Sequence, residues 1–382
     1  MNAVLCIIII FTAWLAYKII SSSRKEEGYQ RWKAGKYSGD TTRERVKAAK
    51  ITKIKNSPDA FRKRRNTPSS SGHSGSYRFK QEAITWCTNL LQIKEEELRT
   101  ILDKVPAQYT YFSLRKRSGG FRQINVPSAL LMSVQQTIYH RILISIPIHP
   151  AAMGFRQRVS ISANARAHLG KPCVLKVDLH DFFPSIRYTR VKAVFEEMGY
   201  PSPVARTLAE LCCLKRKLPQ GAPTSPALSN IVAISLDKKM ETLARNHELT
   251  YTRYADDLTF SGDSLSEDLL LLSIKQIVEE EGFMLNEKKT RFLSAHKRKI
   301  ITGVSVSSGV KLTIPRAKKR EIRKAVHFIL TKGLQEHQTR IGSTDPVYLK
   351  RLLGYLAYWH SIEPENQYVI ESMAELKHLQ VG

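Results

Sequence analysis

The chain has 382 residues and a formal net charge of +27, because 61 lysines and arginines stand against 34 acidic residues. A chain of this length can form two or three subdomains with a sizeable core. So large a positive excess favours a polyanionic partner, nucleic acid first and anionic lipid second, over a solvated basic surface. The cysteines include no Cys-x-x-Cys pair, which argues against a disulfide framework or a zinc site.

Residues 1–22 predict a transmembrane anchor. A helix over residues 1–20 would rise about 30 Å, the thickness of the hydrocarbon core of a bilayer. No lysine or arginine precedes this apolar run, and basic residues are dense after it. The positive-inside rule therefore predicts a single-pass protein of the bacterial inner membrane, with the N-terminus outside and the remainder cytoplasmic. A secretory signal peptide and a buried core helix are the alternatives.

Residues 23–78 read as a basic, partly flexible linker, because serine-rich stretches flank a basic middle section. The cluster at residues 62–65 is suited to anionic lipid or to RNA, and a purely solvated charge run is the remaining alternative.

Residues 80–105 have helical spacing, and residues 109–127 predict a hairpin with a glycine-containing turn and cations on both arms. A hairpin of this kind can clamp a triphosphate, although an exposed basic hairpin is the simpler interpretation. An amphipathic core helix is expected over residues 130–144, and a further helix over 226–240.

Two acidic motifs carry the clearest chemistry. The segment Tyr254-Ala255-Asp256-Asp257 lies between two β-prone runs and predicts a hairpin with adjacent carboxylates at its tip. An apolar strand upstream ends in Asp178. Three converging carboxylates repel one another unless cations lie between them, and a pair of Mg²⁺ ions is the arrangement used for in-line phosphoryl transfer.

The order of these motifs resembles the palm of a reverse transcriptase. Asp178 is followed by Phe182-Phe183, then by Gln220-Gly221-Ala222-Pro223-Thr224-Ser225-Pro226, and then by the Asp256-Asp257 pair. Two further segments resemble marks of retron reverse transcriptases, namely Asn164-Ala165-Arg166-Ala167-His168 and Ile301-Thr302-Gly303. We single out Asn164, His168, Thr302 and Gly303 in these segments and assign them no role. The resemblance covers residues 80–380.

The resemblance implies an α+β, right-hand polymerase fold. The transmembrane helix and the basic linker, predicted from hydropathy and charge, would precede it. We expect fingers at 79–172, a palm with an antiparallel sheet at 173–308, and a helical thumb at 309–382. The basic helices expected near residues 311–361 match a thumb in size and place.

The resemblance also implies the roles of individual residues. The metal ligands would be Asp178, Asp256 and Asp257 with the carbonyl of Leu179, holding two Mg²⁺ ions, with Mn²⁺ as the substitute in vitro. Lys116, Arg122 and Gln220 would bind the incoming nucleotide. Phe183 would exclude a ribose 2′-OH, although a core phenylalanine is the competing interpretation.

By resemblance, the chain is expected to be an RNA-directed DNA polymerase that copies part of a cognate noncoding RNA into single-stranded DNA, giving a branched RNA–DNA (msDNA), in antiphage defence. Its partners would be that RNA, the DNA product, dNTPs, the membrane and an unidentified effector protein. The alternatives are a membrane-anchored abortive-infection polymerase, and a membrane effector that uses the palm only as a nucleic-acid-binding scaffold.

Overall fold

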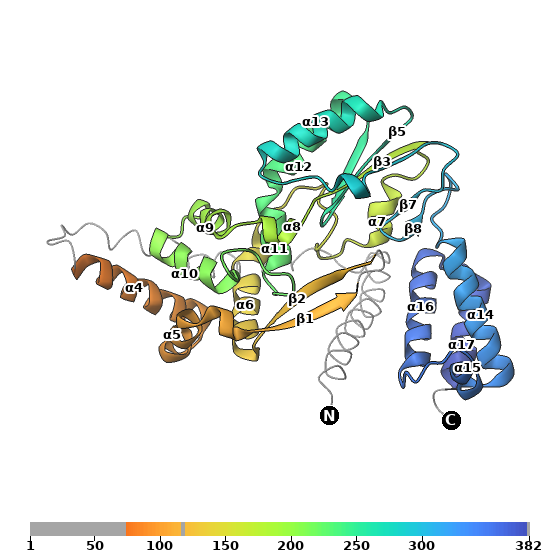
Figure 1. Cartoon of the computed structure of the whole chain (residues 1–382), viewed down its shortest axis with the longest axis horizontal. Helices are drawn as coiled ribbons and strands as arrows, with labels where there is room; N and C mark the ends of the chain where they lie inside the picture. The colour runs from red at the N-terminus through yellow and green to blue at the C-terminus, as the bar shows by residue number, and fades with distance from the viewer. Residues whose placement is uncertain (1–73, 116–118, 380–382) are drawn as a thin grey trace, which may run out of the picture. The chain divides into compact units, whose positions relative to one another are not determined.

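The computed structural model describes residues 74–115 and 119–379 (Figure 1). The predicted anchor at 1–22, nearly all of the linker at 23–78 and the candidate nucleotide ligand Lys116 lie outside these residues.

The membrane part of the predicted fold is corrected here. Over residues 74–115 and 119–379, every helix is too short or too polar to cross a bilayer. On this finding the predicted single-pass architecture, the inner-membrane location and the membrane as a partner are not retained.

The described chain begins with two helices where the sequence predicted one. Helix α4 spans Ser74–Leu91 and α5 spans Glu95–Asp103. The break follows from Gln92, which has a left-handed φ of 53° that a continuing α-helix cannot accommodate. Three glutamates fill the first turn of α5, where negative charge is favourable next to the helix dipole.

The predicted basic hairpin is confirmed. Strands β1 (Tyr109–Arg115) and β2 (Phe121–Pro127) pair antiparallel along their whole length. Helix α6 (Ala129–Arg141) follows, and the Ser128 side chain caps it by accepting a hydrogen bond from the backbone of Leu131.

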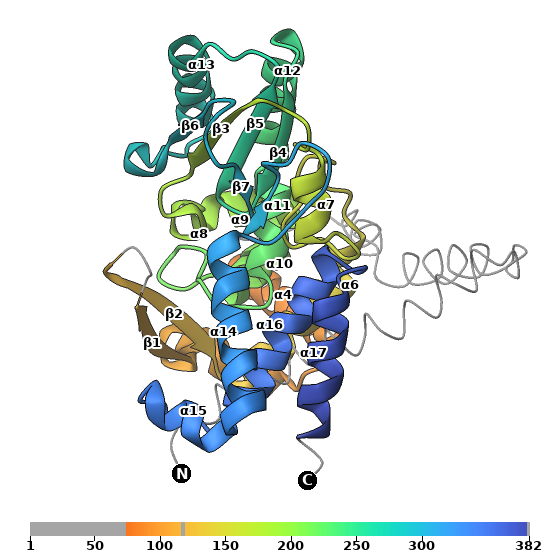
Figure 2. The same ribbon diagram turned by 90° about the vertical axis from the view of Figure 1, so that its right-hand side faces the viewer.

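The central sheet has four antiparallel strands in the order β4-β5-β3-β6 (Figures 1 and 2). Its members are β4 (Thr250–Tyr254), β5 (Asp257–Gly262), β3 (Cys173–Asp178) and β6 (Arg291–Leu293). Strand β3 lies between β5 and β6, and its apolar residues are buried. The sheet therefore joins the two acidic segments, which are far apart in the sequence.

Further α-helices lie along the chain between α6 and strand β6. They are α7 (Ile161–Arg166), α8 (Phe182–Ser185), α9 (Tyr188–Glu197), α10 (Ser202–Cys212), α11 (Ser225–Val232), α12 (Ile234–Asn246) and α13 (Glu267–Glu280). The helix predicted over 226–240 is thus two helices, separated at Ala233. Helix α12 packs on β4 and α13, as Figure 2 shows.

The C-terminal part consists of a small hairpin and four helices. Strands β7 (Ile300–Ile301) and β8 (Val304–Ser305) precede α14 (Arg316–Lys332), α15 (Leu334–Arg340), α16 (Tyr348–Ile362) and α17 (Gln367–His378). One apolar cluster includes Val174 of β3, Ile301 of β7 and the fully buried Trp359 of α16. The C-terminal helices therefore share a core with strand β3 of the central sheet.

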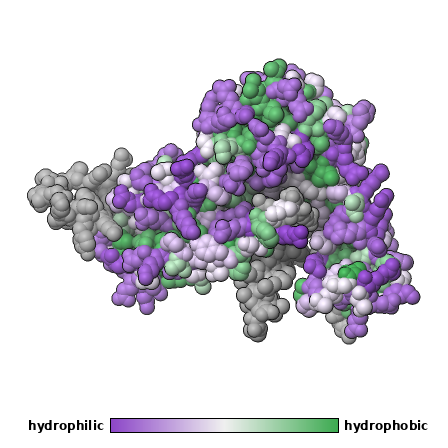
Figure 3. Space-filling model, viewed as in Figure 1, coloured by the Kyte–Doolittle hydropathy of each residue, from purple (hydrophilic) through white to green (hydrophobic). Residues whose placement is uncertain are grey.

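The surface drawn in Figure 3 is mostly hydrophilic, as the strong positive charge of the chain predicts. A hydrophobic area lies over α13, where the side chains of Leu269 and Leu272 are exposed.

Candidate functional site

Antiparallel pairing of β3 and β5 places Asp178 directly opposite Asp257. The two-residue turn between β4 and β5 contains Ala255 and Asp256, so the third carboxylate lies at the same end of the sheet. The backbone N–H of Leu179 donates to the carbonyl of Asp256 at 2.9 Å and fixes the end of β3 against the turn. The structure thus brings together the four residues that were predicted as metal ligands.

The buried guanidinium of Arg253 stabilises this turn. Arg253 is completely buried and donates from Nε and Nη2 to the two carboxylate oxygens of Asp237, at 2.7 and 2.6 Å. Its Nη1 donates at 3.1 Å to the carbonyl of Ala255, whose φ of 59° lies in the left-handed region. The sequence analysis missed this pair, although an arginine inside an otherwise uncharged, β-prone strand was a signal for it.

Gly154 lies close under the turn. A Cβ atom at this position would lie 2.7 Å from the backbone nitrogen of Ala255, closer than real contacts allow. The carbonyl of Gly154 accepts a hydrogen bond from the buried Asn230, which in turn accepts from Arg253. A glycine at 154 is therefore required for the close packing that fixes the carboxylate turn.

The carboxylates are electrostatically unfavourable in the absence of a cation. Burial raises the pKa of Asp256 to about 6, and repulsion by Asp257 and Asp178 adds to the effect. Burial also raises the pKa of Asp257, with a further contribution from Asp178. Groups held in this way gain from any cation that reaches them.

A lysine from outside the predicted motif contacts one of the acids. Lys289 donates from Nζ to both carboxylate oxygens of Asp178, at 2.9 and 2.8 Å. Within the described residues, no group of three acidic, histidine or cysteine side chains is spaced to hold a metal ion. The donor set of Asp178, Asp256 and Asp257 nevertheless fits a hard divalent cation, because carboxylate oxygens are its preferred ligands.

The predicted nucleotide-binding residues lie on separate elements. Phe183 is half-buried in α8. Its ring centroid lies 5.7 Å from that of Phe182 and 5.9 Å from that of Phe155. The carbonyl of Gln220 accepts from the backbone of Asn125 in β2 at 2.8 Å. Arg122 is exposed on β2. The Gln220 segment is thus attached to the basic hairpin, a connection that the sequence did not reveal.

Gly221 explains this attachment. Its φ is +126°, and a Cβ atom there would lie 2.6 Å from the carbonyl oxygen of Asn125. Only glycine permits both the dihedral angle and the close approach.

The segments of unassigned role are buried and hydrogen-bonded. His168 is fully buried, with Nδ1 2.7 Å from the hydroxyl of Ser261 in β5 and Nε2 2.7 Å from the hydroxyl of Thr252 in β4. Burial lowers the pKa of His168 to about 4, with a smaller contribution from Lys176. The imidazole is therefore neutral near pH 7.

The second of these segments contacts the first. Asn164 Nδ2 lies 3.4 Å from the hydroxyl of Thr302, and the carbonyl of Gly303 accepts a hydrogen bond from Tyr358 at 3.1 Å.

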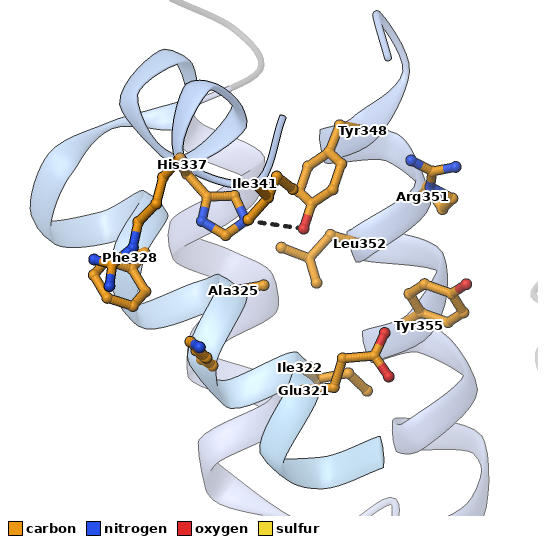
Figure 4. A pocket seen from close by; sticks show the side chains of 12 residues that line it. Glu321, Ile322, Ala325, Phe328, His337, Ile341, Tyr348, Arg351, Leu352 and Tyr355 are labelled. Carbon is orange, nitrogen blue, oxygen red and sulfur yellow. Dashed lines mark hydrogen bonds between the residues drawn. The ribbon is translucent and has the colours of Figure 1, made fainter. Parts of the chain in front are cut away.

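A cavity of about 420 Å³ lies among the C-terminal helices rather than beside the carboxylates (Figure 4). Phe328, His337, Tyr348 and Tyr355 are among its lining residues. His337 Nε2 and the Tyr348 hydroxyl are 2.9 Å apart, and Nδ1 of His337 is buried without a partner among the described residues. The cavity does not take part in the carboxylate site.

An antiparallel sheet that presents three carboxylates at one end is characteristic of the nucleotidyl-transferring polymerases. The sequence matches the family described as "Reverse transcriptase (RNA-dependent DNA polymerase)" over residues 114–328. It is 37% identical over 277 residues to the retron Mx65 reverse transcriptase of Myxococcus xanthus, covering 67% of this chain and 62% of that protein. It is 33% identical over 275 residues to the retron Ec86 reverse transcriptase of Escherichia coli, covering 70% and 86%. The chain therefore belongs to the reverse transcriptase family, as a member of the retron type.

The chain spans less than two thirds of the length of the Myxococcus xanthus relative. Among solved structures, a telomerase from Candida albicans aligns with a TM-score of 0.41 at 11% identity, covering 71% of this chain and 63% of the telomerase. That likeness is too low to carry an argument about this protein.

Proposed function

We propose that the chain is an RNA-directed DNA polymerase that copies part of a cognate structured noncoding RNA into single-stranded DNA. The observation that supports this most directly is the meeting of Asp178, Asp256 and Asp257 at one end of the sheet. A branched RNA–DNA product (msDNA) and a role in antiphage defence belong to the same proposal and rest on the resemblance to retron reverse transcriptases alone. The net charge of +27 suits an RNA template and a DNA product.

We propose three subdomains with the boundaries predicted from the sequence. Residues 79–172 form the fingers, 173–308 the palm and 309–382 the thumb. In the palm, Asp178, Asp256, Asp257 and the carbonyl of Leu179 hold two divalent cations, for which Mg²⁺ is our proposal. When bound, such ions neutralise charge on the attacking and leaving oxygens of the phosphoryl transfer.

The remaining site residues bind and orient the nucleotide. Arg122 and Lys116 are proposed to hold the triphosphate, as cations on a hairpin arm can. Gln220 supports the nucleotide from the segment that is attached to β2. Phe183 is proposed to exclude a ribose 2′-OH. Arg253 holds the carboxylate turn rigid, so that little reorganisation is needed when the reaction begins.

Asp256→Asn and Asp257→Asn test this proposal by primer extension on poly(rA)–oligo(dT) with Mg²⁺. Each variant removes one negative charge from the proposed metal site, and we expect synthesis to fall at least about 100-fold. Binding of the same template, measured by filter retention, should be preserved. The matched control is Asp263→Asn, since Asp263 is a highly exposed acid beyond the end of β5. Undiminished Mg²⁺-dependent synthesis by either variant would refute the assignment.

A further inference from the structure

The turn between β7 and β8 contains a strained residue. Thr302 and Gly303 form this two-residue turn, with φ angles of 46° and 85°. Tight hairpins of this kind need positive φ at both positions, and asparagine, aspartate and glycine adopt it readily. A β-branched threonine at positive φ is an outlier. The chain thus keeps a strained side chain where an unstrained one would close the same hairpin.

The hydroxyl of Thr302 accounts for this choice. It donates at 3.2 Å to the carbonyl of Ile161 at the start of α7, and it lies 3.4 Å from Nδ2 of Asn164 in the same helix. Asn164 is only 1% exposed, and its side-chain oxygen has no partner among the described residues. Strain and an unsatisfied polar atom thus coincide at a single contact, and such features usually persist for a functional reason.

The same turn contacts the C-terminal helices. Tyr358 of α16 donates to the carbonyl of Gly303 at 3.1 Å. A Cβ atom on Gly303 would lie 3.5 Å from that hydroxyl. The apolar cluster beneath includes Ile301 and Val304 on either side of the turn, together with Leu356 of α16. The hydrogen bond therefore lies above a shared core and fixes the direction of α16 against the hairpin.

The segment that follows α7 contacts the carboxylate hairpin. His168 lies 2.7 Å from hydroxyls on both β4 and β5, the strands on either side of the turn that contains Asp256. Helix α7 also packs on β7 and β8. A series of polar contacts thus runs from the strands of the carboxylate hairpin, through α7 and the Thr302–Gly303 turn, to α16. It is buried at His168, partly buried at Thr302 and exposed at the Tyr358 hydrogen bond.

We propose that Asn164, Thr302 and Tyr358 are positioning residues that hold helices α14–α17 in a fixed orientation relative to the hairpin that carries Asp256 and Asp257. This inference rests on the proposed polymerase function, because a growing duplex must stay between these two parts over many cycles of addition. A looser junction leaves the carboxylates intact. It therefore raises the chance of dissociation between additions without slowing a single addition.

The test compares the variants Thr302→Gly, Thr302→Ser and Tyr358→Phe with the wild type, all as full-length chains. Glycine relieves the strain but removes the hydroxyl, whereas serine keeps the hydroxyl. Tyr355→Phe is the matched control, since Tyr355 lies one turn earlier in α16 and its hydroxyl makes no hydrogen bond to a described residue. Single-nucleotide addition and product length in the presence of a heparin trap are measured on poly(rA)–oligo(dT). The melting temperature and the hydrogen exchange of residues 298–306 and 354–362 are measured without substrate.

We expect Thr302→Gly and Tyr358→Phe to shorten the products several-fold, while the first addition changes by less than about twofold. Thr302→Gly should keep or raise the melting temperature, and both variants should exchange faster at residues 354–362. Thr302→Ser and Tyr355→Phe should match the wild type. The inference would be overturned if Thr302→Gly and Tyr358→Phe made products of wild-type length. It would also be overturned if Thr302→Ser and Thr302→Gly shortened the products equally. Failure of the wild type to extend any primer would instead count against the polymerase function, and the exchange measurement would still decide whether the junction orients α16.

Discussion

The guanidinium of Arg253 donates to the carbonyl of Ala255 at 3.1 Å, so the strand that leads into the carboxylate turn also holds the turn in place. The charge that makes this bond is neutralised by Asp237 in α12, and neither side chain is exposed. Tyr251 adds a hydrogen bond to Asp237 at 2.8 Å. The conformation of the turn therefore depends on an ion pair that water does not reach.

Breaking this pair from one side should be costly. Asp237→Asn leaves the charge of Arg253 buried without a counter-charge, and we expect a loss of about 3–5 kcal/mol in the free energy of unfolding. Urea denaturation measures this loss. Glu280→Gln provides the comparison, because Glu280 pairs with Lys239 at an exposed site, where only a small loss is expected. Equal, small losses in both variants would show that the buried pair does not support the turn.

The neutral state of His168 predicts a pH dependence of stability. Its pKa is about 4 in the folded chain against an ordinary value of 6.5, so the unfolded chain binds more protons between these values. The free energy of unfolding is therefore not reduced by His168 above pH 6.5. It falls by about 1.4 kcal/mol per pH unit as the pH decreases from 6.5 toward 4. Denaturation at pH 8 and pH 5 should show a smaller difference for His168→Gln than for the wild type.

The control for this prediction is His296→Gln, because His296 is exposed. It should keep the wild-type difference between the two pH values. If His168→Gln also keeps it, the imidazole is protonated in the folded chain and the hydroxyls of Ser261 and Thr252 do not hold it neutral.

Phe183 is expected to set the choice of sugar. Its ring is half-buried between Phe182 and Phe155, which limits the rotamers through which it could move away from a 2′-OH. Phe183→Val should reduce discrimination against ribonucleotides by about tenfold or more. The ratio of kcat/KM for dTTP and UTP on poly(rA)–oligo(dT) gives the measure.

The neighbouring Phe182 separates this effect from packing. It is 3% exposed and its ring lies against Phe283, so Phe182→Leu should lower the melting temperature without changing the sugar ratio. A wild-type enzyme that already uses both sugars equally well would show that Phe183 is not a gate.

Local sequence patterns predicted the elements that present the site. The β-prone runs on both sides of Asp256 and Asp257 predicted the hairpin, and an apolar run ending at Asp178 predicted the opposing strand. Both depend on periodicity within a few residues, which a sequence shows directly. The breaks at Gln92 and Ala233 were missed, because a single change in φ leaves the helical spacing of the side chains almost intact.

The partners of the site residues were beyond the reach of the sequence. Lys289 lies 111 residues from Asp178, and Asn164 lies 138 residues from Thr302. Which of many lysines or polar residues meets a given acid or hydroxyl depends on how the elements pack. Arg253 was detectable as an unusual residue in a strand, but its partner Asp237 lies on a different element.

The bond between Lys289 and Asp178 predicts a competition with metal ions. Lys289 Nζ donates to both carboxylate oxygens of Asp178, whose side chain is 8% exposed. A divalent cation that binds Asp178 must therefore displace the lysine. Lys289→Gln removes the competing charge, and we expect Mn²⁺ to bind about two- to fivefold more tightly, as the loss of a pair worth about 0.4–1 kcal/mol implies.

Electron paramagnetic resonance of free Mn²⁺ measures this affinity without requiring catalysis, which matters because Lys289 lies close enough to the carboxylates to affect the reaction itself. Lys275→Gln is the control for the general loss of positive charge, since Lys275 pairs with Glu287 at 2.9 Å on the surface. It should leave the Mn²⁺ affinity nearly unchanged. Equal or weaker binding in Lys289→Gln would mean that the lysine does not occupy the cation position, and that Asp178 meets the metal through other oxygen lone pairs.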